Sequence, residues 1–135
     1  MLRKINQILA MPELGKLILR VSFGIMMLFH GWAKIVHGVA PIEKMLVAHG
    51  FPAIMAWGYL VTEVVAPACM VLGLWTRLSA LIVAWGMVVA TYLSDTNLSG
   101  VTAVGAWEAE KTAVYLFAAV ATALLGSGRY AVRPD

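Results

Sequence analysis

One carboxylate and one proline stand close together in a strongly apolar stretch of the sequence. Glu63 lies near the middle of a run from Ala53 to Leu74, and Pro67 follows it by four residues. A charged carboxyl group at the centre of a membrane helix costs roughly 2.5–3.5 kcal/mol on insertion scales. Because proline has no N–H, the carbonyl four residues before it loses its helical donor. We therefore expect a bend at Pro67, with the side-chain and main-chain oxygens of Glu63 concentrated beside it.

Polar groups at that depth in a membrane must be satisfied by protein, water or a ligand. Glu63 is therefore a candidate to receive a proton, a cation or a hydrogen-bonding ligand such as a quinol. The alternative hypothesis is a structural ion pair with Arg20, which would orient two helices and do no chemistry.

A second group of candidates lies in the first apolar segment. Three- and four-residue spacing places one set of residues on a single helix face: Arg20, Gly24, Met27, Gly31 and Lys34. The glycines allow a neighbouring helix to approach closely. His30 borders this face and titrates near neutral pH, which suits proton transfer, although a bond to a backbone carbonyl is the alternative. Arg20 and Lys34 are candidate ligand contacts, or anchors that reach the membrane interface.

The remaining candidates flank these residues toward one side of the membrane. Tyr59 precedes Glu63 by one helical turn, and Tyr115 follows Lys111 by one turn. We expect an outward-opening cleft with Glu63 at its floor and Glu63 and His30 handling protons. The predicted ligand-binding residues are Arg20, Lys34, Tyr59, Trp107, Glu108 and Tyr115. In the alternative interpretation, Glu108 pairs with Lys111 at a helix start and the aromatic residues belong to an interfacial belt.

Composition indicates the solvent in which these groups lie. Of the 135 residues, 61% are hydrophobic and 13% are charged, against roughly 45–50% and 25% in soluble domains. Four long apolar segments predict four membrane-spanning helices at about residues 15–36, 53–74, 77–94 and 107–125. The expected fold is therefore all-α, an integral membrane four-helix bundle in one domain.

The distribution of basic residues predicts the orientation of the bundle. Of the 10 lysines and arginines, seven fall on the side that holds both termini. The positive-inside rule then places the N- and C-termini in the cytoplasm. Because the basic residues form no run, nucleic acid is not an expected partner.

Two short segments and the single cysteine complete the predictions from composition. Residues 1–11 read as an amphipathic segment at the membrane interface, and residues 41–50 as a short interfacial helix. Cys69 is the one cysteine, so the chain alone forms no disulfide, and its three histidines are too scattered to indicate a metal site. No flavin, nicotinamide or haem-ligand pattern is present, so a redox centre would come from a partner protein or from quinone.

Three stretches resemble the DoxX family. They are "LRVSFGIMMLFHGWAKI", "EVVAPACMVLGLWTRLSAL" and "WEAEKTAVYLFAAVATALLGSGRYAV". The residues that match the family pattern are Arg20, His30, Lys34, Glu63, Arg77, Trp107, Glu108 and Arg129. Family members commonly have two glycines soon after the glutamate, where this chain has "AP". Many also carry a histidine late in the third helix, where this chain has "YLSD", and Tyr92 and Asp95 are the candidates to replace it.

The resemblance implies a four-helix protein of the bacterial inner membrane, linked to quinone-coupled sulfur oxidation or to complexes that handle oxidative stress. The leading hypothesis is a membrane subunit of an oxidoreductase system that binds quinone or a similar amphipathic ligand non-covalently. Its partners would be the lipid bilayer, a redox protein and further copies of the chain. The alternatives are a small proton-coupled transporter that uses Glu63, and a scaffold for a soluble redox enzyme.

Overall fold

The chain is helical along almost its whole length. A computed structural model describes all 135 residues, with one isolated bridge between Val101 and Trp107 as its β-type pairing. The elements are α1 (Leu2–Leu9), α2 (Pro12–His37), α3 (Ala40–Ala48), the 3₁₀ segment η1 (Ala53–Gly58), the π-helical segment η2 (Leu60–Val65), α4 (Ala66–Leu72), α5 (Thr76–Leu93) and α6 (Glu110–Leu125). The prediction of an all-helical protein is confirmed.

Three helical segments are long and apolar enough to cross a membrane. They are Pro12–His37, Ala53–Leu72 and Thr76–Leu93. The fourth predicted span is shorter than expected, because α6 has 16 residues and a spanning helix needs about 20. Residues 107–109 form a turn that precedes α6.

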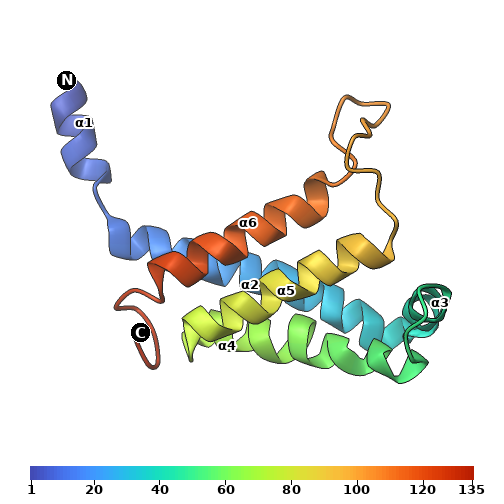
Figure 1. Cartoon of the computed structure of the whole chain (residues 1–135). Helices are drawn as coiled ribbons and strands as arrows, with labels where there is room; N and C mark the ends of the chain where they lie inside the picture. Colours follow the sequence, from blue (N-terminus) through green and yellow to red (C-terminus); the bar gives the residue numbers. More distant parts are fainter.

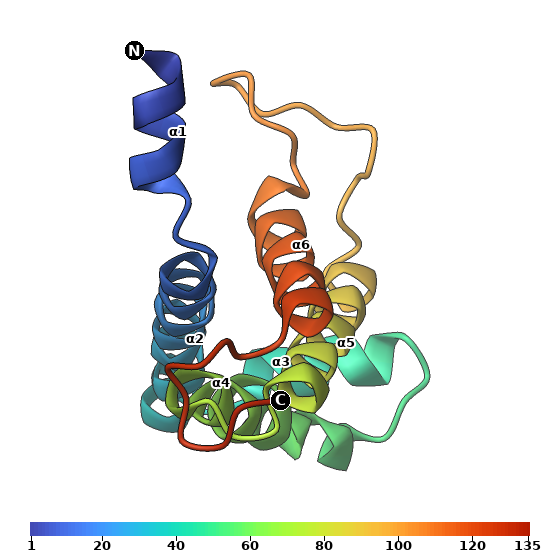
Figure 2. The same ribbon diagram turned by 90° about the vertical axis from the view of Figure 1, so that its left-hand side faces the viewer.

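The long elements pack side by side in a closed arrangement (Figure 1). α2 contacts the second segment (η2 and α4) and α6, and α5 contacts both α4 and α6. The start of α2, the α4–α5 turn and residues 126–135 lie at one end, the tail end. α3 and the 94–109 loop lie at the opposite end, the loop end. α1 projects away from the other helices, as Figure 2 also shows.

The contacts between these helices use small and flexible side chains. The main core comprises Met27, Ala66, Met70, Ala80, Val83, Ala84, Met87 and Ala119. Large aromatic side chains instead face outward, with Phe29, Trp32 and Trp85 each more than 60% exposed. Lipid tails are as apolar as these side chains, so helices in a membrane associate through close packing of small residues. The apolar surface therefore suits contact with lipid, and the small core residues suit close helix packing within a membrane.

Two glycines bring α2 against the backbone of the second segment. A Cβ added at Gly31 would lie 2.5 Å from the carbonyl oxygen of Glu63, and one added at Gly24 would lie 3.1 Å from the carbonyl oxygen of Pro67. The prediction that these glycines allow close helix approach is confirmed. The main-chain oxygen of Glu63 thus lies directly beside α2.

The second segment is not one regular α-helix. It begins as a 3₁₀-helix, continues as the π-helix Leu60–Val65 and becomes α-helical only from Ala66. Within it, the N–H of Ala66 donates to the carbonyl of Val61, five residues back. Pro67 lies in the first turn of α4, where its missing N–H is tolerated. The predicted irregularity therefore falls before the proline, in the π-helical turn that carries Glu63.

We expect Gly31→Ala to destabilise the protein, because the new Cβ requires α2 and η2 to move apart. Overpacking of this kind typically costs about 1–3 kcal/mol. Thermal unfolding in detergent would measure the change. Gly15→Ala, in the same helix, is the matched control, because a Cβ there meets no atom within 4 Å. Equal stability of the two variants would contradict the close backbone contact at Gly31.

Candidate functional site

Glu63 forms an ion pair with Lys34 across the contact between η2 and α2. The Glu63 side chain is 9% exposed and that of Lys34 is 29% exposed. A buried carboxylate is stable only with a partner, and Lys34 provides a charge-assisted hydrogen bond. The alternative pair between Glu63 and Arg20 is not formed, because Arg20 lies at the tail end.

The ion pair borders a cavity of about 680 Å³ at the loop end. This volume falls within the roughly 300–1,000 Å³ of typical small-molecule sites. Its polar lining residues are His30, Lys34, Tyr59, Thr62, Glu63, Ser94, Lys111 and Thr112. Its apolar lining includes Ile42, Met45, Leu46, Met55, Trp85, Val89 and Leu93. Five helical elements and η1 therefore converge on one space, with Glu63 as the only acid in its lining.

His30 reaches this cavity from α2 and packs edge-on against Tyr115 of α6. The two ring centroids are 5.5 Å apart, and Phe23 contacts the other side of Tyr115 at 5.7 Å. Tyr115 does not line the cavity itself. It instead fixes the orientation of the His30 ring.

Tyr59 lines the cavity and is only 7% exposed. It belongs to a second, smaller core at the loop end with Val39, Leu46, Ala56 and Leu93. This core attaches α3 to the start of the second segment and to the end of α5. The short interfacial helix predicted at residues 41–50 therefore corresponds to α3, which forms part of the cavity wall.

Trp107 and Glu108 lie outside the cavity and shape the 94–109 loop. The indole Nε1 of Trp107 donates to the Leu98 carbonyl at 2.7 Å. The N–H of Glu108 donates to the Gly100 carbonyl at 3.1 Å, and its carboxylate packs against Gly100. The predicted pair between Glu108 and Lys111 is absent, because Glu108 precedes α6 and turns back into the loop.

Arg20 is 1% exposed and ties the tail end together. Its guanidinium donates to the carbonyls of Met70 at 3.0 Å, Val71 at 2.7 Å and Ser127 at 3.1 Å, and also to that of Tyr130. It therefore bonds main-chain carbonyls, and it does not line the cavity. Its contacts are structural, because they join α2 and α4 to the last ten residues.

A second motif arginine has a similar structural environment. Arg77 donates to the carbonyls of Ala123 and Leu124 at the end of α6, each at 2.9 Å. The last carbonyls of a helix have no partner within the helix, so Arg77 satisfies two of them.

Lys111, Thr62 and Trp85 are cavity residues that the sequence predictions missed. Lys111 was assigned to a surface pair with Glu108, and neither Thr62 nor Trp85 carried a signal. Their position depends on which faces of α5 and α6 turn toward α3. A single sequence of helices that are apolar on all faces does not encode that rotation clearly.

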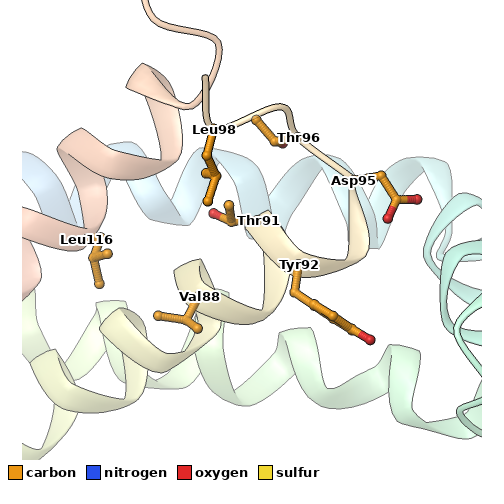
Figure 3. Close-up of a pocket in the computed structure, with 7 residues that line it drawn as sticks. All are labelled: Val88, Thr91, Tyr92, Asp95, Thr96, Leu98 and Leu116. Carbon is orange, nitrogen blue, oxygen red and sulfur yellow. The ribbon is translucent and has the colours of Figure 1, made fainter. Parts of the chain in front are cut away.

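A second hollow of about 520 Å³ lies along α5 and the 94–109 loop (Figure 3). It is lined by Val88, Thr91, Tyr92, Asp95, Thr96, Leu98 and Leu116. Its one acid, Asp95, is already paired with His49. The hollow therefore offers fewer free polar groups than the cavity beside Glu63.

His49 joins α3 to the end of α5. Its Nδ1 donates to the Met45 carbonyl at 2.7 Å, and its Nε2 donates to Asp95 at 2.9 Å. Both partners are acceptors, so the two bonds form together only when both ring nitrogens carry hydrogen, in the imidazolium form. The Met45 carbonyl and then Asp95 raise the pKa of His49. The ring centroid also lies 5.1 Å from that of Tyr92, so the histidine that follows α3 lies beside both Tyr92 and Asp95, the two residues of the "YLSD" stretch considered above.

Most of the elements that line the cavity lie in a region that matches a known protein family. The family model DoxX matches residues 15–95. The chain belongs to the DoxX family. The matched region runs from α2 to the end of α5 and includes Arg20, His30, Lys34 and Glu63. No curated protein and no solved structure matches the chain.

No group of three or more histidine, cysteine or acidic side chains lies together in this DoxX protein in a way that could hold a metal ion. The charged and titratable groups that line the cavity include the Lys34–Glu63 ion pair, His30 and the unpaired Lys111.

The His49–Asp95 pair predicts that stability depends on pH. Because the pKa of His49 is raised in the folded protein, the pair stabilises the fold below about pH 6.5, the usual value for histidine. This stabilisation is lost as the pH rises through the raised pKa. The melting temperature of the wild type should therefore fall as the pH rises from about 5.5 to about 8.5, and the fall should be smaller in Asp95→Asn.

His37→Gln is the control for this prediction, because His37 is exposed and forms none of the salt bridges. It should keep the wild-type dependence on pH. An unchanged decline in His49→Gln would show that another group is responsible.

Proposed function

We propose that this DoxX chain is a four-helix membrane bundle of the bacterial inner membrane with both termini in the cytoplasm. The closed packing of α2, the second segment, α5 and α6 supports four spans, with residues 107–109 extending the short α6 toward the interface. The excess of lysine and arginine at the tail end supports the orientation.

Within that bundle, we propose that the chain serves as a membrane subunit of an oxidoreductase system and binds a quinone or a similar amphipathic ligand. The observation that carries this proposal is the cavity beside the Lys34–Glu63 pair, with His30 on the same wall. An apolar lining with a few convergent polar groups is the usual form of a small-molecule site.

Quinone and quinol differ by two electrons and two protons, so a site for them needs groups that hold protons. Glu63, which is paired with Lys34, and His30, which suits proton transfer near neutral pH, are the two lining groups that we propose to hold these protons. The electrons would come from a redox partner protein.

The proton-coupled transporter receives less support from the same geometry. Such a transporter needs Glu63 to bind a cationic substrate, but Lys34 already supplies a cation to this carboxylate. A second ammonium group, Lys111, also lines the cavity.

We expect quinone to co-purify with the wild-type protein and to be depleted in Glu63→Gln. Lipid extraction followed by mass spectrometry would compare the quinone-to-protein ratio with that of the starting membranes. Glu110→Gln is the matched control, because Glu110 is exposed and does not line the cavity. Equal quinone content in purified wild-type protein and in Glu63→Gln would contradict a site at Glu63.

The same variant should remain folded with a modest loss of stability. An exposed ion pair contributes up to about 1 kcal/mol, and breaking a buried pair costs about 3–5 kcal/mol. Because Lys34 is half-buried and can turn outward, the loss should fall between these values. Lys34→Met should cost more, since it leaves Glu63 without a cation, and the double variant should recover part of that loss.

Reporter fusions test the proposed orientation. Fusions to the N-terminus and to residue 135 should both report a cytoplasmic location, because the basic residues gather at the tail end. A fusion in the 94–109 loop should report the opposite side. A periplasmic signal from either terminus would overturn the orientation and place the cavity near the cytoplasmic face.

A further inference from the structure

Lys111 is a cation in the cavity lining that has no carboxylate partner. The three salt bridges of the chain join Lys16 to Glu13, Lys34 to Glu63 and His49 to Asp95. Glu108, the partner expected from helix spacing, faces Gly100 instead. Lys111 is therefore free to meet a group that enters the cavity.

The charges of the cavity are unequal. Two ammonium groups, Lys34 and Lys111, line it together with one carboxylate, Glu63, which is already engaged by Lys34. His30 lies within electrostatic reach of all three of these groups, and its ring nitrogens form none of the hydrogen bonds of the chain. The basic groups left uncommitted in the cavity are thus the ammonium group of Lys111 and the imidazole ring of His30.

The rest of the lining suits an apolar body. Leu46 of α3, and Val89 and Leu93 of α5, form a wall beside Trp85. A ligand with a flat or hydrocarbon body could lie against this wall while its polar head reaches the basic groups.

We propose that the cavity selects an amphipathic anion, whose negative charge lies beside Lys111 and His30 and whose apolar body lies against the α3–α5 wall. This inference rests on the proposed ligand-binding function and specifies the charge of the ligand. A neutral molecule of the same shape fills the same space but leaves Lys111 unpaired. A cationic molecule meets two ammonium groups.

Two naphthoquinones of similar size test this selection. 2-Hydroxy-1,4-naphthoquinone is an anion at neutral pH, whereas 2-methyl-1,4-naphthoquinone is neutral. Binding is measured by quenching of tryptophan fluorescence in nanodiscs of phosphatidylcholine, with empty nanodiscs as the correction for partitioning. The Trp85→Phe variant isolates the quenching at Trp85, which lines the cavity but is also exposed on the surface. Trp32→Phe is its control, because Trp32 is similarly exposed and does not line the cavity.

The wild type should bind the anion at least about tenfold more tightly than the neutral compound, as expected for a charge-assisted hydrogen bond. Lys111→Met should abolish this preference by weakening only the anion, and Lys111→Arg should retain it. Lys44→Met is the matched control, since Lys44 is exposed on α3 and does not line the cavity. It should behave as the wild type.

The outcomes separate this inference from the proposed function. Equal binding of the two compounds to the wild type, or a preference that persists in Lys111→Met, would overturn the anion selection and leave the ligand site standing. Failure of the wild type to bind either compound would overturn the ligand site and the anion selection together.

Discussion

The ion pair between Lys34 and Glu63 is the constraint on which the arrangement of the helices depends. A carboxylate in the middle of an apolar segment needs a cation within reach of its side chain, so α2 must lie against the second segment at this level. Gly31 makes that approach possible, because a side chain there would collide with the Glu63 carbonyl. The π-helical turn then places Glu63 beside the cavity that residues of α2, α3 and α5 also line. The same contact that neutralises the charge also creates a polar wall for the cavity.

The two ends of the protein use their charged residues differently. At the loop end, the ionisable groups border a cavity and some of them remain free. At the tail end, Arg20 and Arg77 donate hydrogen bonds to backbone carbonyls that helix termini would otherwise leave unpaired. Residues that match one family pattern therefore have different environments. Some bond main-chain carbonyls at the tail end, and others line the cavity. A family resemblance alone does not separate these roles, because both kinds of residue are polar groups within apolar segments.

The sequence predicted the features that follow from periodicity and composition. The all-helical fold, three of the four expected spans, the close approach at Gly24 and Gly31 and the irregular backbone before Pro67 follow from local rules. The pairing of Glu63 with Lys34 rather than with Arg20 did not follow from local rules, because it depends on which part of α2 lies beside η2. The turn of Glu108 into the loop was also missed, since it depends on contacts with Gly100 rather than on helix spacing. Whether the site binds quinone, and how the chain lies in the membrane, remain predictions.

The environment of Arg20 has a consequence for biosynthesis. Its guanidinium bonds carbonyls that are 50 and 51 residues later in the chain, and others that are 107 and 110 residues later. When α2 leaves the ribosome, none of these partners has been synthesised, so the guanidinium lacks its carbonyl acceptors until α4 follows. Ser127 and Tyr130, which are synthesised after α6, complete its set of acceptors. Residues 126–135 thus take part in assembling the bundle, because without Ser127 and Tyr130 the buried Arg20 would keep only two of its four carbonyl partners.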